Sequence, residues 1–249
     1  MNPLRITVIG AAGMSGSRIV AEALARGHEV TAVGRNAARL GELAGITDPS
    51  GAEGPAAPEG PGDRARLAGP GERPGGVVRV RAADAADLHE VARLAAGQDV
   101  VVLATRPAFG SEEEAAIVMK AVLAGLAGGG ARLIVVGGAG SLIVPGNGGR
   151  LAIDDESFVP PQWRGAAQAS NDQYDVCRTA GADVDWTYLS PAAIFEPGER
   201  TGRYRVGADE LLVDAHGRSA ISGEDLAAAL LDEIEQPRFD RGRRFTVGY

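Results

Sequence analysis

The chain has 249 residues, of which 45% are hydrophobic and 23% charged, so it is long enough for one large globular domain with a substantial core. Its formal net charge of −8 lacks the basic excess that sequence-independent binding to nucleic acids or anionic membranes requires. The single cysteine, Cys177, excludes an intrachain disulfide, and the three scattered histidines show no metal-ligand spacing. Because no signal sequence or long apolar run is recognisable, we expect a cytoplasmic protein.

The predicted elements alternate between strand and helix along the chain. A β-branched apolar run at residues 4–9 indicates a buried strand, and a glycine-rich turn and an amphipathic helix that ends at Gly27 follow it. The other expected strands lie at 28–33, 77–80, 98–104, 132–137, 185–189, 203–206, 211–214 and 244–247, and the other expected helices at about 87–96, 112–127, 163–180 and 223–235.

The central strands are apolar without alternation, which is expected when helices cover both faces of a sheet. Right-handed crossovers then give an α/β fold, a doubly wound parallel sheet of the Rossmann type with helices on both faces, in a single domain over residues 1–249. Residues 45–76 are rich in glycine and proline and nearly devoid of large apolar side chains. We therefore expect a disordered insertion within the domain there.

Three glycines, Gly10, Gly13 and Gly16, lie between the first predicted strand and the first predicted helix. In this context Gly10 allows a tight turn, Gly13 lets the backbone approach a pyrophosphate, and Gly16 permits close packing of helix on strand. The free N–H groups at the start of the helix favour phosphate oxygens. We therefore expect a dinucleotide cofactor to contact Gly10, Ala12, Gly13, Met14, Ser15 and Gly16.

The end of the second strand indicates which dinucleotide binds. NAD-preferring sites place an Asp or Glu there to bind the ribose 2′-hydroxyl, whereas this chain has Arg35 and Asn36 and no acid. A guanidinium can bind a 2′-phosphate in bidentate fashion, and Arg39 lies one helical turn further on. We therefore predict NADPH as the preferred cofactor, with NADH possible.

The G-x-x-G-x-x-G spacing resembles the extended and atypical branches of the short-chain dehydrogenase superfamily. That resemblance implies that Asp84, after the third strand, lies near the adenine. Standard members use a Tyr-x-x-x-Lys pair, but the only lysine, Lys120, lies in the wrong region. Tyr174 and Arg178 have the pair's spacing, yet Tyr174 comes late in its helix. We interpret Tyr174 as an ordinary helix-face residue and expect an enzyme without this dyad.

The sequence after the last crossover helix carries a more specific resemblance. Residues 185–192 resemble the strand and turn of NmrA-like and other atypical short-chain dehydrogenases, in which the backbone equivalent to Pro191 and Ala192 lies beside the nicotinamide. Residues 195–214 and 245–249 closely resemble the NADH-flavin reductase family, to which biliverdin reductase B is distantly related. The resemblance covers nearly the whole chain except 45–76. It implies reduction of free flavin, as a substrate, by a nicotinamide cofactor.

Flavin reduction is consistent with the absent dyad, because the cofactor and the flavin supply the chemistry and water can supply the proton. Ligands of such sheets bind beyond the carboxyl ends of the strands. The further candidates for cofactor contact are therefore Ala104, Thr105 and Arg106, and the resemblance adds Pro191 and Ala192. We also consider Ser141 as a weak candidate for a catalytic group facing the nicotinamide. Two interpretations stay open for Arg200 and Arg203: they bind a flavin phosphate, or they are solvated side chains without a ligand.

Two alternatives stay open. One is a reductase or isomerase of a small carbonyl metabolite with unrecognised acid–base groups. The other is an NmrA-like redox sensor that binds NADP(H) and signals to a protein partner without turnover. We expect a small-molecule acceptor as the partner, no nucleic acid or membrane, and a monomer or homodimer.

Overall fold

The computed structural model describes residues 2–36, 38–41, 65–66, 76–179, 183–239 and 241–249. Of the insertion predicted at 45–76, only residues 65–66 and Gly76 belong to this set, so the expectation of disorder lies outside the described residues. The strands of the larger sheet are β1 (Arg5–Ile9), β2 (Glu29–Gly34), β3 (Ala65–Arg66), β4 (Val77–Ala82), β5 (Val100–Leu103), β6 (Arg132–Val136), β7 (Trp186–Pro191), β9 (Arg205–Gly207) and β11 (Arg243–Gly248).

These nine strands form one sheet in the order β3-β4-β2-β1-β5-β6-β7-β11-β9. The seven strands from β4 to β11 in this order run parallel, whereas β3 and β9 pair antiparallel at the two edges. Strand order reverses beside β1, where β2 lies on one side and β5 on the other. The expected doubly wound parallel sheet is therefore confirmed, and its reversal point is where ligands bind in such folds.

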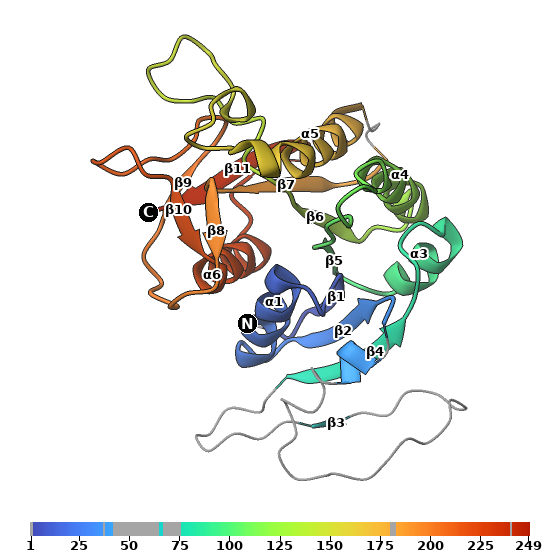
Figure 1. Cartoon of the computed structure of the whole chain (residues 1–249). Helices are drawn as coiled ribbons and strands as arrows, with labels where there is room; N and C mark the ends of the chain where they lie inside the picture. The colour runs from blue at the N-terminus through green and yellow to red at the C-terminus, as the bar shows by residue number, and fades with distance from the viewer. Residues whose placement is uncertain (1, 37, 42–64, 67–75, 180–182, 240) are drawn as a thin grey trace.

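Helices cover both faces of the sheet (Figure 1). One face carries α1 (Met14–Ala25) and α6 (Gly223–Glu235), and the other carries α3 (Leu88–Ala95), α4 (Glu114–Leu126) and α5 (Arg164–Thr179). Two short 3-10 helices, η1 (Ala152–Asp154) and η2 (Pro161–Trp163), precede α5.

The core consists of two clusters, one on each side of the sheet. Val8, Val102 and Ile134 belong to the cluster beneath α1 and α6, whereas Leu103 and Val135 belong to the cluster beneath α3, α4 and α5. Successive residues of β5 and β6 thus point to opposite faces, and all of them except the first residue of β6 are buried. This double burial explains why these strands are apolar without alternation.

Ion pairs join α1 to the C-terminal part of the chain. Arg26 pairs with Asp232 and Glu235 of α6 at 2.8 Å each, and Glu22 receives hydrogen bonds from Arg26 and Arg200 at 2.7–2.8 Å. Burial acts to raise the pKa of Glu22, but the two guanidinium groups outweigh it and hold that pKa below its ordinary value. Glu22 is therefore ionised at neutral pH and fixes the C-terminal segment to α1.

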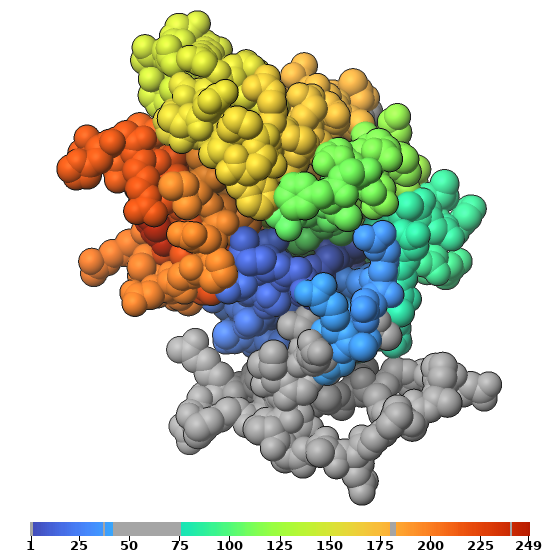
Figure 2. Space-filling view, in the orientation of Figure 1, coloured from blue at the N-terminus to red at the C-terminus, as the bar shows by residue number. Residues whose placement is uncertain are grey.

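The strand predicted at 211–214 is wrong. Leu211 is buried in a third cluster with Leu142 and Val144 of the segment after β6, and Asp214 begins a tight turn. Leu211 is buried and Leu212 and Val213 are partly buried, but residues 211–214 form no strand ladder. Figure 2 shows the yellow-green surface of the segment after β6 adjoining the red-orange surface of the segment after β9 on one side of the molecule. Two three-residue strands, β8 (Ile194–Glu196) and β10 (Ala220–Ser222), were not predicted, because they are too short to show periodicity.

Candidate functional site

The parallel strands bring most of the predicted site residues to one edge of the sheet. Ile9 at the end of β1 lies level with Val33 of β2 and Leu103 of β5, and Leu103 lies level with Val135 of β6. The segments that follow these strands therefore meet at the carboxyl edge. These segments contain Gly10–Gly16, Arg35, Arg39, Asp84, Ala104–Arg106, Ser141 and, after β7, Ala192.

The glycine-rich turn is shaped by two close backbone approaches. Gly10 has a φ of +89°, and a Cβ atom on it would lie 2.5 Å from the carbonyl oxygen of Ala104. A Cβ atom on Gly16 would lie 2.1 Å from the carbonyl oxygen of Gly10. Only glycine fits at either position, because the obstructing atoms are backbone. These contacts hold the start of α1 against the end of β1, as the glycine spacing predicts.

The first turn of α1 leaves backbone donors free. Gly13 is the N-cap residue and its position has no side-chain cap, and the first turn contains no acidic residue. The N–H groups of Met14, Ser15 and Gly16 have no hydrogen-bond acceptor within the described residues. Such a helix start combines unpaired donors with the positive end of the helix dipole. The residues present therefore fit the pyrophosphate of a dinucleotide.

A basic side chain with an acidic neighbour follows β2. Arg35 is 68% exposed, and its Nη1 lies 3.6 Å from Oε2 of Glu114, at the start of α4. The side chain of Asn36 accepts hydrogen bonds from the N–H groups of Ala38 and Arg39, and so holds Arg39 on a helical turn beside Arg35. Both arginines face solvent, as binding of a 2′-phosphate requires. Sequence reasoning missed Glu114, because nothing local pairs it with Arg35.

Asp84 stabilises the turn that follows β4. Its Oδ1 accepts a hydrogen bond from the N–H of Ala86 at 3.0 Å, and its own N–H donates to Oε2 of Glu90 at 2.7 Å. The side chain is exposed at the carboxyl edge. These hydrogen bonds fix the turn that carries the carboxylate, and a contact between Asp84 and the adenine stays a prediction.

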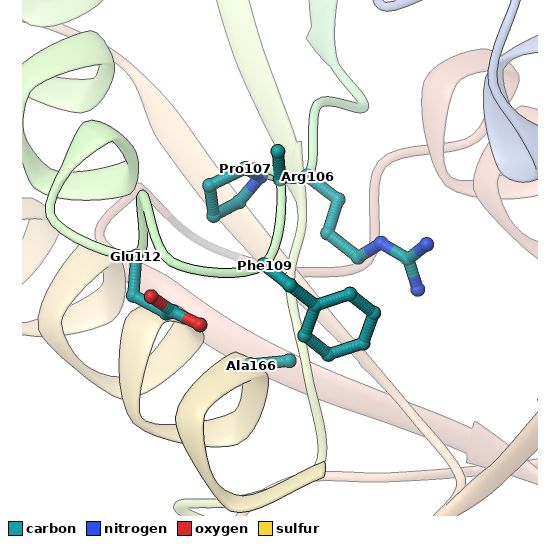
Figure 3. Close-up of a pocket in the computed structure, with 6 residues that line it drawn as sticks. Arg106, Pro107, Phe109, Glu112 and Ala166 are labelled. Atoms are coloured by element: carbon teal, nitrogen blue, oxygen red, sulfur yellow. The ribbon is translucent and has the colours of Figure 1, made fainter. Parts of the chain in front are cut away.

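An exposed aromatic cluster lies beside the predicted cofactor residues Thr105 and Arg106. Phe109 and Trp163 are 67% and 44% exposed, their ring centroids are 5.6 Å apart, and the Arg106 guanidinium lies 5.8 Å from the Trp163 ring. Figure 3 shows the Arg106 side chain and the Phe109 ring extending to the same side of the loop, with Ala166 of α5 near the ring. The hollow here holds only about 10 Å³, so the cluster is an open surface.

Ser141 is held by a buried arginine. Arg244 donates to Oγ of Ser141 at 2.8 Å and to its carbonyl oxygen at 3.2 Å, and it also pairs with Asp209 at 2.7 Å. The same guanidinium lies 4.6 Å from the Tyr174 ring. The Ser141 hydroxyl therefore has a fixed structural partner, and its catalytic role stays a prediction.

Tyr174 packs into the interior of the α5 face. Its ring lies 4.8 Å from the Tyr188 ring and 6.5 Å from the Trp186 ring, measured between centroids. Burial raises the pKa of Tyr174, and the facing charge of Arg244 offsets this only in part. A proton donor of the dehydrogenase type needs the opposite shift, so this environment does not favour catalysis by Tyr174. Lys120 lies exposed on α4, a different helix.

The remaining predicted residues differ in their exposure and in their partners. Pro191 and Ala192 are buried at the end of β7, and their contact with a nicotinamide stays a prediction. Arg200 forms a bidentate ion pair with Glu22, which leaves its guanidinium engaged away from any flavin phosphate. Arg203 is exposed, and its side chain has no partner within the described residues.

Comparison with known proteins agrees with this geometry. Residues 70–237 match the family model for NAD(P)H-binding proteins, and residues 6–124 match that of the NAD-dependent epimerase/dehydratase family. The chain belongs to the NAD(P)H-binding family. A nicotinamide dinucleotide is thus the cofactor class of this NAD(P)H-binding protein, and the expected family resemblance is confirmed.

Full-length relatives of this NAD(P)H-binding protein share its fold. The uncharacterized protein YwnB of Bacillus subtilis is 33% identical, over 98% of both chains. A crystal structure named as a putative exported protein of Burkholderia pseudomallei is 39% identical, with a TM-score of 0.75 over 99% of this chain and 100% of that chain. A crystal structure named as a putative NADH-flavin reductase of Streptococcus pneumoniae is 27% identical, with a TM-score of 0.74 over 98% and 99% of the two chains.

The described residues lack two other features. No helix among them has the length and apolar character that crossing a membrane requires. No group of three or more His, Cys, Asp or Glu side chains among them could hold a metal ion.

Proposed function

We propose that this protein is an NADPH-dependent reductase of free flavin or a similar planar acceptor. The observation that carries the proposal is the exposed pair of Phe109 and Trp163 beside Arg106, at the same sheet edge as the glycine-rich turn. Large aromatic side chains are rarely left exposed together without a ligand or partner. A flat ring system can stack on these rings, and a guanidinium favours electron-rich faces.

The chain's own residues bind and orient the cofactor in this proposal. The unpaired N–H groups of Met14, Ser15 and Gly16 hold the pyrophosphate, as their free donors and the bare first turn of α1 suggest. Arg35 and Arg39 hold the 2′-phosphate of NADPH. The remaining contacts proposed are those of Gly10, Ala12, Gly13, Asp84, Ala104, Thr105, Pro191 and Ala192.

The reaction requires little acid–base chemistry from the protein. When bound, the nicotinamide supplies a hydride to the acceptor, and water supplies the balancing proton. The protein's part is to hold two flat rings in contact and to exclude competing geometries. These roles of cofactor and protein fit a site in which Tyr174 is half-buried with a raised pKa and Lys120 lies on another helix.

The test is NADPH oxidation followed by absorbance, with FMN and riboflavin as acceptors and NADH in parallel. We expect saturable turnover that favours NADPH. Phe109→Ala and Trp163→Ala should each raise KM for flavin, whereas Ile117→Ala, which removes an exposed apolar side chain on the outside of α4, should not. Tight NADPH binding without turnover on any acceptor would instead favour the sensor alternative.

The single-domain organisation over 1–249, the cytoplasmic location and the monomeric or homodimeric state also stay predictions. Size-exclusion chromatography coupled to light scattering tests the last of these. A role for Ser141 in hydride transfer is tested by Ser141→Ala, which should lower kcat without changing NADPH affinity.

A further inference from the structure

A second cavity, of about 240 Å³, opens beyond the end of β7. Its apolar lining consists of Phe158, Ala193 and Ile194, from the segment before η2 and the start of β8. Its polar lining comes mainly from a turn of the C-terminal segment, with His216, Arg218 and Ser219. The cavity thus combines an apolar surface with two basic side chains.

The turn that carries these basic side chains is fixed by its own backbone. Oδ1 of Asp214 accepts hydrogen bonds from the N–H groups of His216 at 2.8 Å and Arg218 at 2.9 Å. Gly217 adopts a φ of +77°, and the N–H of Asp214 donates to the carbonyl oxygen of Arg218 at 2.8 Å. Hydrogen bonds from the backbone N–H groups of Arg218 and His216 hold the pKa of Asp214 below its ordinary value, and the charges of the two side chains act in the same direction from beyond ion-pair distance.

Both basic side chains are available for a ligand. The imidazole of His216 and the guanidinium of Arg218 are exposed, and neither has a hydrogen-bond or ion-pair partner within the described residues. Most arginines near the C-terminal segment are occupied, as Arg200 is by Glu22 and Arg244 by Asp209. An unpaired guanidinium at the mouth of a cavity is a binding group for phosphate or carboxylate.

A buried hydroxyl adds a donor to the wall of the same cavity. Ser219 is 2% exposed, and its Oγ accepts a hydrogen bond from the N–H of Ala193 at 3.1 Å. Its own proton has no acceptor in the part of the chain that the structure describes. A buried O–H donor without an acceptor is costly, so a ligand oxygen in the cavity would satisfy it.

The cavity adjoins the proposed acceptor surface along the chain. Ala193 directly follows Ala192, which we propose lies beside the nicotinamide, and Phe158 and Trp163 belong to the same segment before α5. An acceptor that meets a nicotinamide beside Ala192 would therefore lie next to this cavity, with its anionic group facing Arg218.

From this arrangement we infer that Arg218 and His216 bind an anionic group of the acceptor, so that a flavin with a phosphate is preferred over one without. The inference rests on the proposed function for its acceptor. FMN and riboflavin are the matched probes, since they share the ring and the ribityl chain and differ in the phosphate.

The experiment compares KM for FMN and for riboflavin in the wild-type protein and in single variants. We expect Arg218→Gln to raise KM for FMN about three- to tenfold, which is the scale of one partly exposed charge-assisted hydrogen bond, and to leave riboflavin unchanged. His216→Gln should act in the same direction and more weakly. Added salt should reduce the wild-type preference for FMN.

Two further variants remove one arginine each. Arg93→Gln, on α3 and outside this cavity, should change neither KM. If Arg203→Gln rather than Arg218→Gln selectively weakens FMN, the phosphate binds elsewhere and the inference is wrong. Equal KM values for the two flavins in the wild-type protein would also overturn it.

Flavin binding without turnover separates this inference from the proposed function. The quenching of flavin fluorescence gives the Kd of FMN and of riboflavin in the absence of NADPH. If FMN binds more tightly and Arg218→Gln abolishes the difference, the inference holds even when no NADPH is oxidised, and only the reductase proposal fails. Equal Kd values, or no flavin binding, would refute the anion site.

Discussion

Replacement of Glu114 by glutamine should tighten the binding of NADPH. Oε2 of Glu114 lies 3.6 Å from Nη1 of Arg35, which we propose binds the 2′-phosphate. Two unit charges at this distance interact by about 1 kcal/mol in water, and exposed pairs are worth at most about that much. A carboxylate this near both competes for the guanidinium and repels the phosphate. We therefore expect Glu114→Gln to lower the Kd of NADPH about three- to tenfold.

The assay is isothermal titration with NADPH and NADH, on Glu114→Gln and on Arg35→Ala. Arg35→Ala should weaken NADPH by about 1–3 kcal/mol, the scale of a lost charge-assisted hydrogen bond. Neither variant should change NADH by more than a fraction of this, because NADH has no 2′-phosphate. Glu113→Gln removes the same charge one residue away and is the matched control. An equal change for both cofactors, or weaker NADPH binding in Glu114→Gln, would refute the assignment of Arg35.

Three other predictions concern the turn and the packing. Gly13→Val should fold, since a Cβ atom there approaches only backbone oxygens, at 3.2 and 3.8 Å. The variant should lose binding of both cofactors. Retained NADPH affinity would mean that the turn is only structural. Cys177 is buried, and burial raises the pKa of its thiol to about 12. Thiol reagents should therefore label Cys177 only after unfolding. Rapid labelling of the native protein would contradict the packing of α5. Because the folded pKa of Glu22 lies below 4.5, its ionised form stabilises the fold above that pH and the contribution is lost as pH falls through the folded pKa. Glu22→Gln should cost about 1–3 kcal/mol at neutral pH by urea unfolding, and its penalty should shrink in acid; a penalty independent of pH would count against the ion pairs.

Local patterns made most of the fold predictable. β5 and β6 are buried on both faces, and this produces the continuous apolar runs that identified them. The helix predicted at 223–235 has those bounds in the structure, since Ser222 caps its start through a hydrogen bond from the N–H of Asp225. The strand predicted at 211–214 failed because packing against the segment after β6 produces the same apolar pattern as a sheet ladder.

Of the candidate site, the sequence could predict the parts that lie within one segment. The spacing of Gly10, Gly13 and Gly16 encodes the turn, because Cβ atoms on Gly13 and Gly16 would both approach the carbonyl oxygen of Gly10. The approach of Gly10 to Ala104 joins distant segments and shows no local pattern beyond the glycine itself. Contacts between distant segments leave no such pattern. The approach of Glu114 to Arg35 arises only when α4 packs beside the end of β2.

The same limit applies to the aromatic cluster. Phe109 and Trp163 are far apart in the chain, and their contact depends on the loop after β5 meeting the start of α5. The turn with His216 and Arg218 was missed for a related reason, since its partners across the cavity come from the segments before η2 and after β7. An exposed tryptophan next to two prolines, Pro160 and Pro161, was the one available signal.

The placement of β11 has a consequence for how the chain folds during synthesis. β11 lies between β7 and β9, so both of its neighbours in the sheet leave the ribosome before it does. Until residues 243–248 emerge, one side of β7 is an unpaired apolar edge, and such edges recruit strands from other molecules. Nascent or truncated chains that stop short of β11 should therefore aggregate or require chaperones, whereas the complete sheet hides this edge.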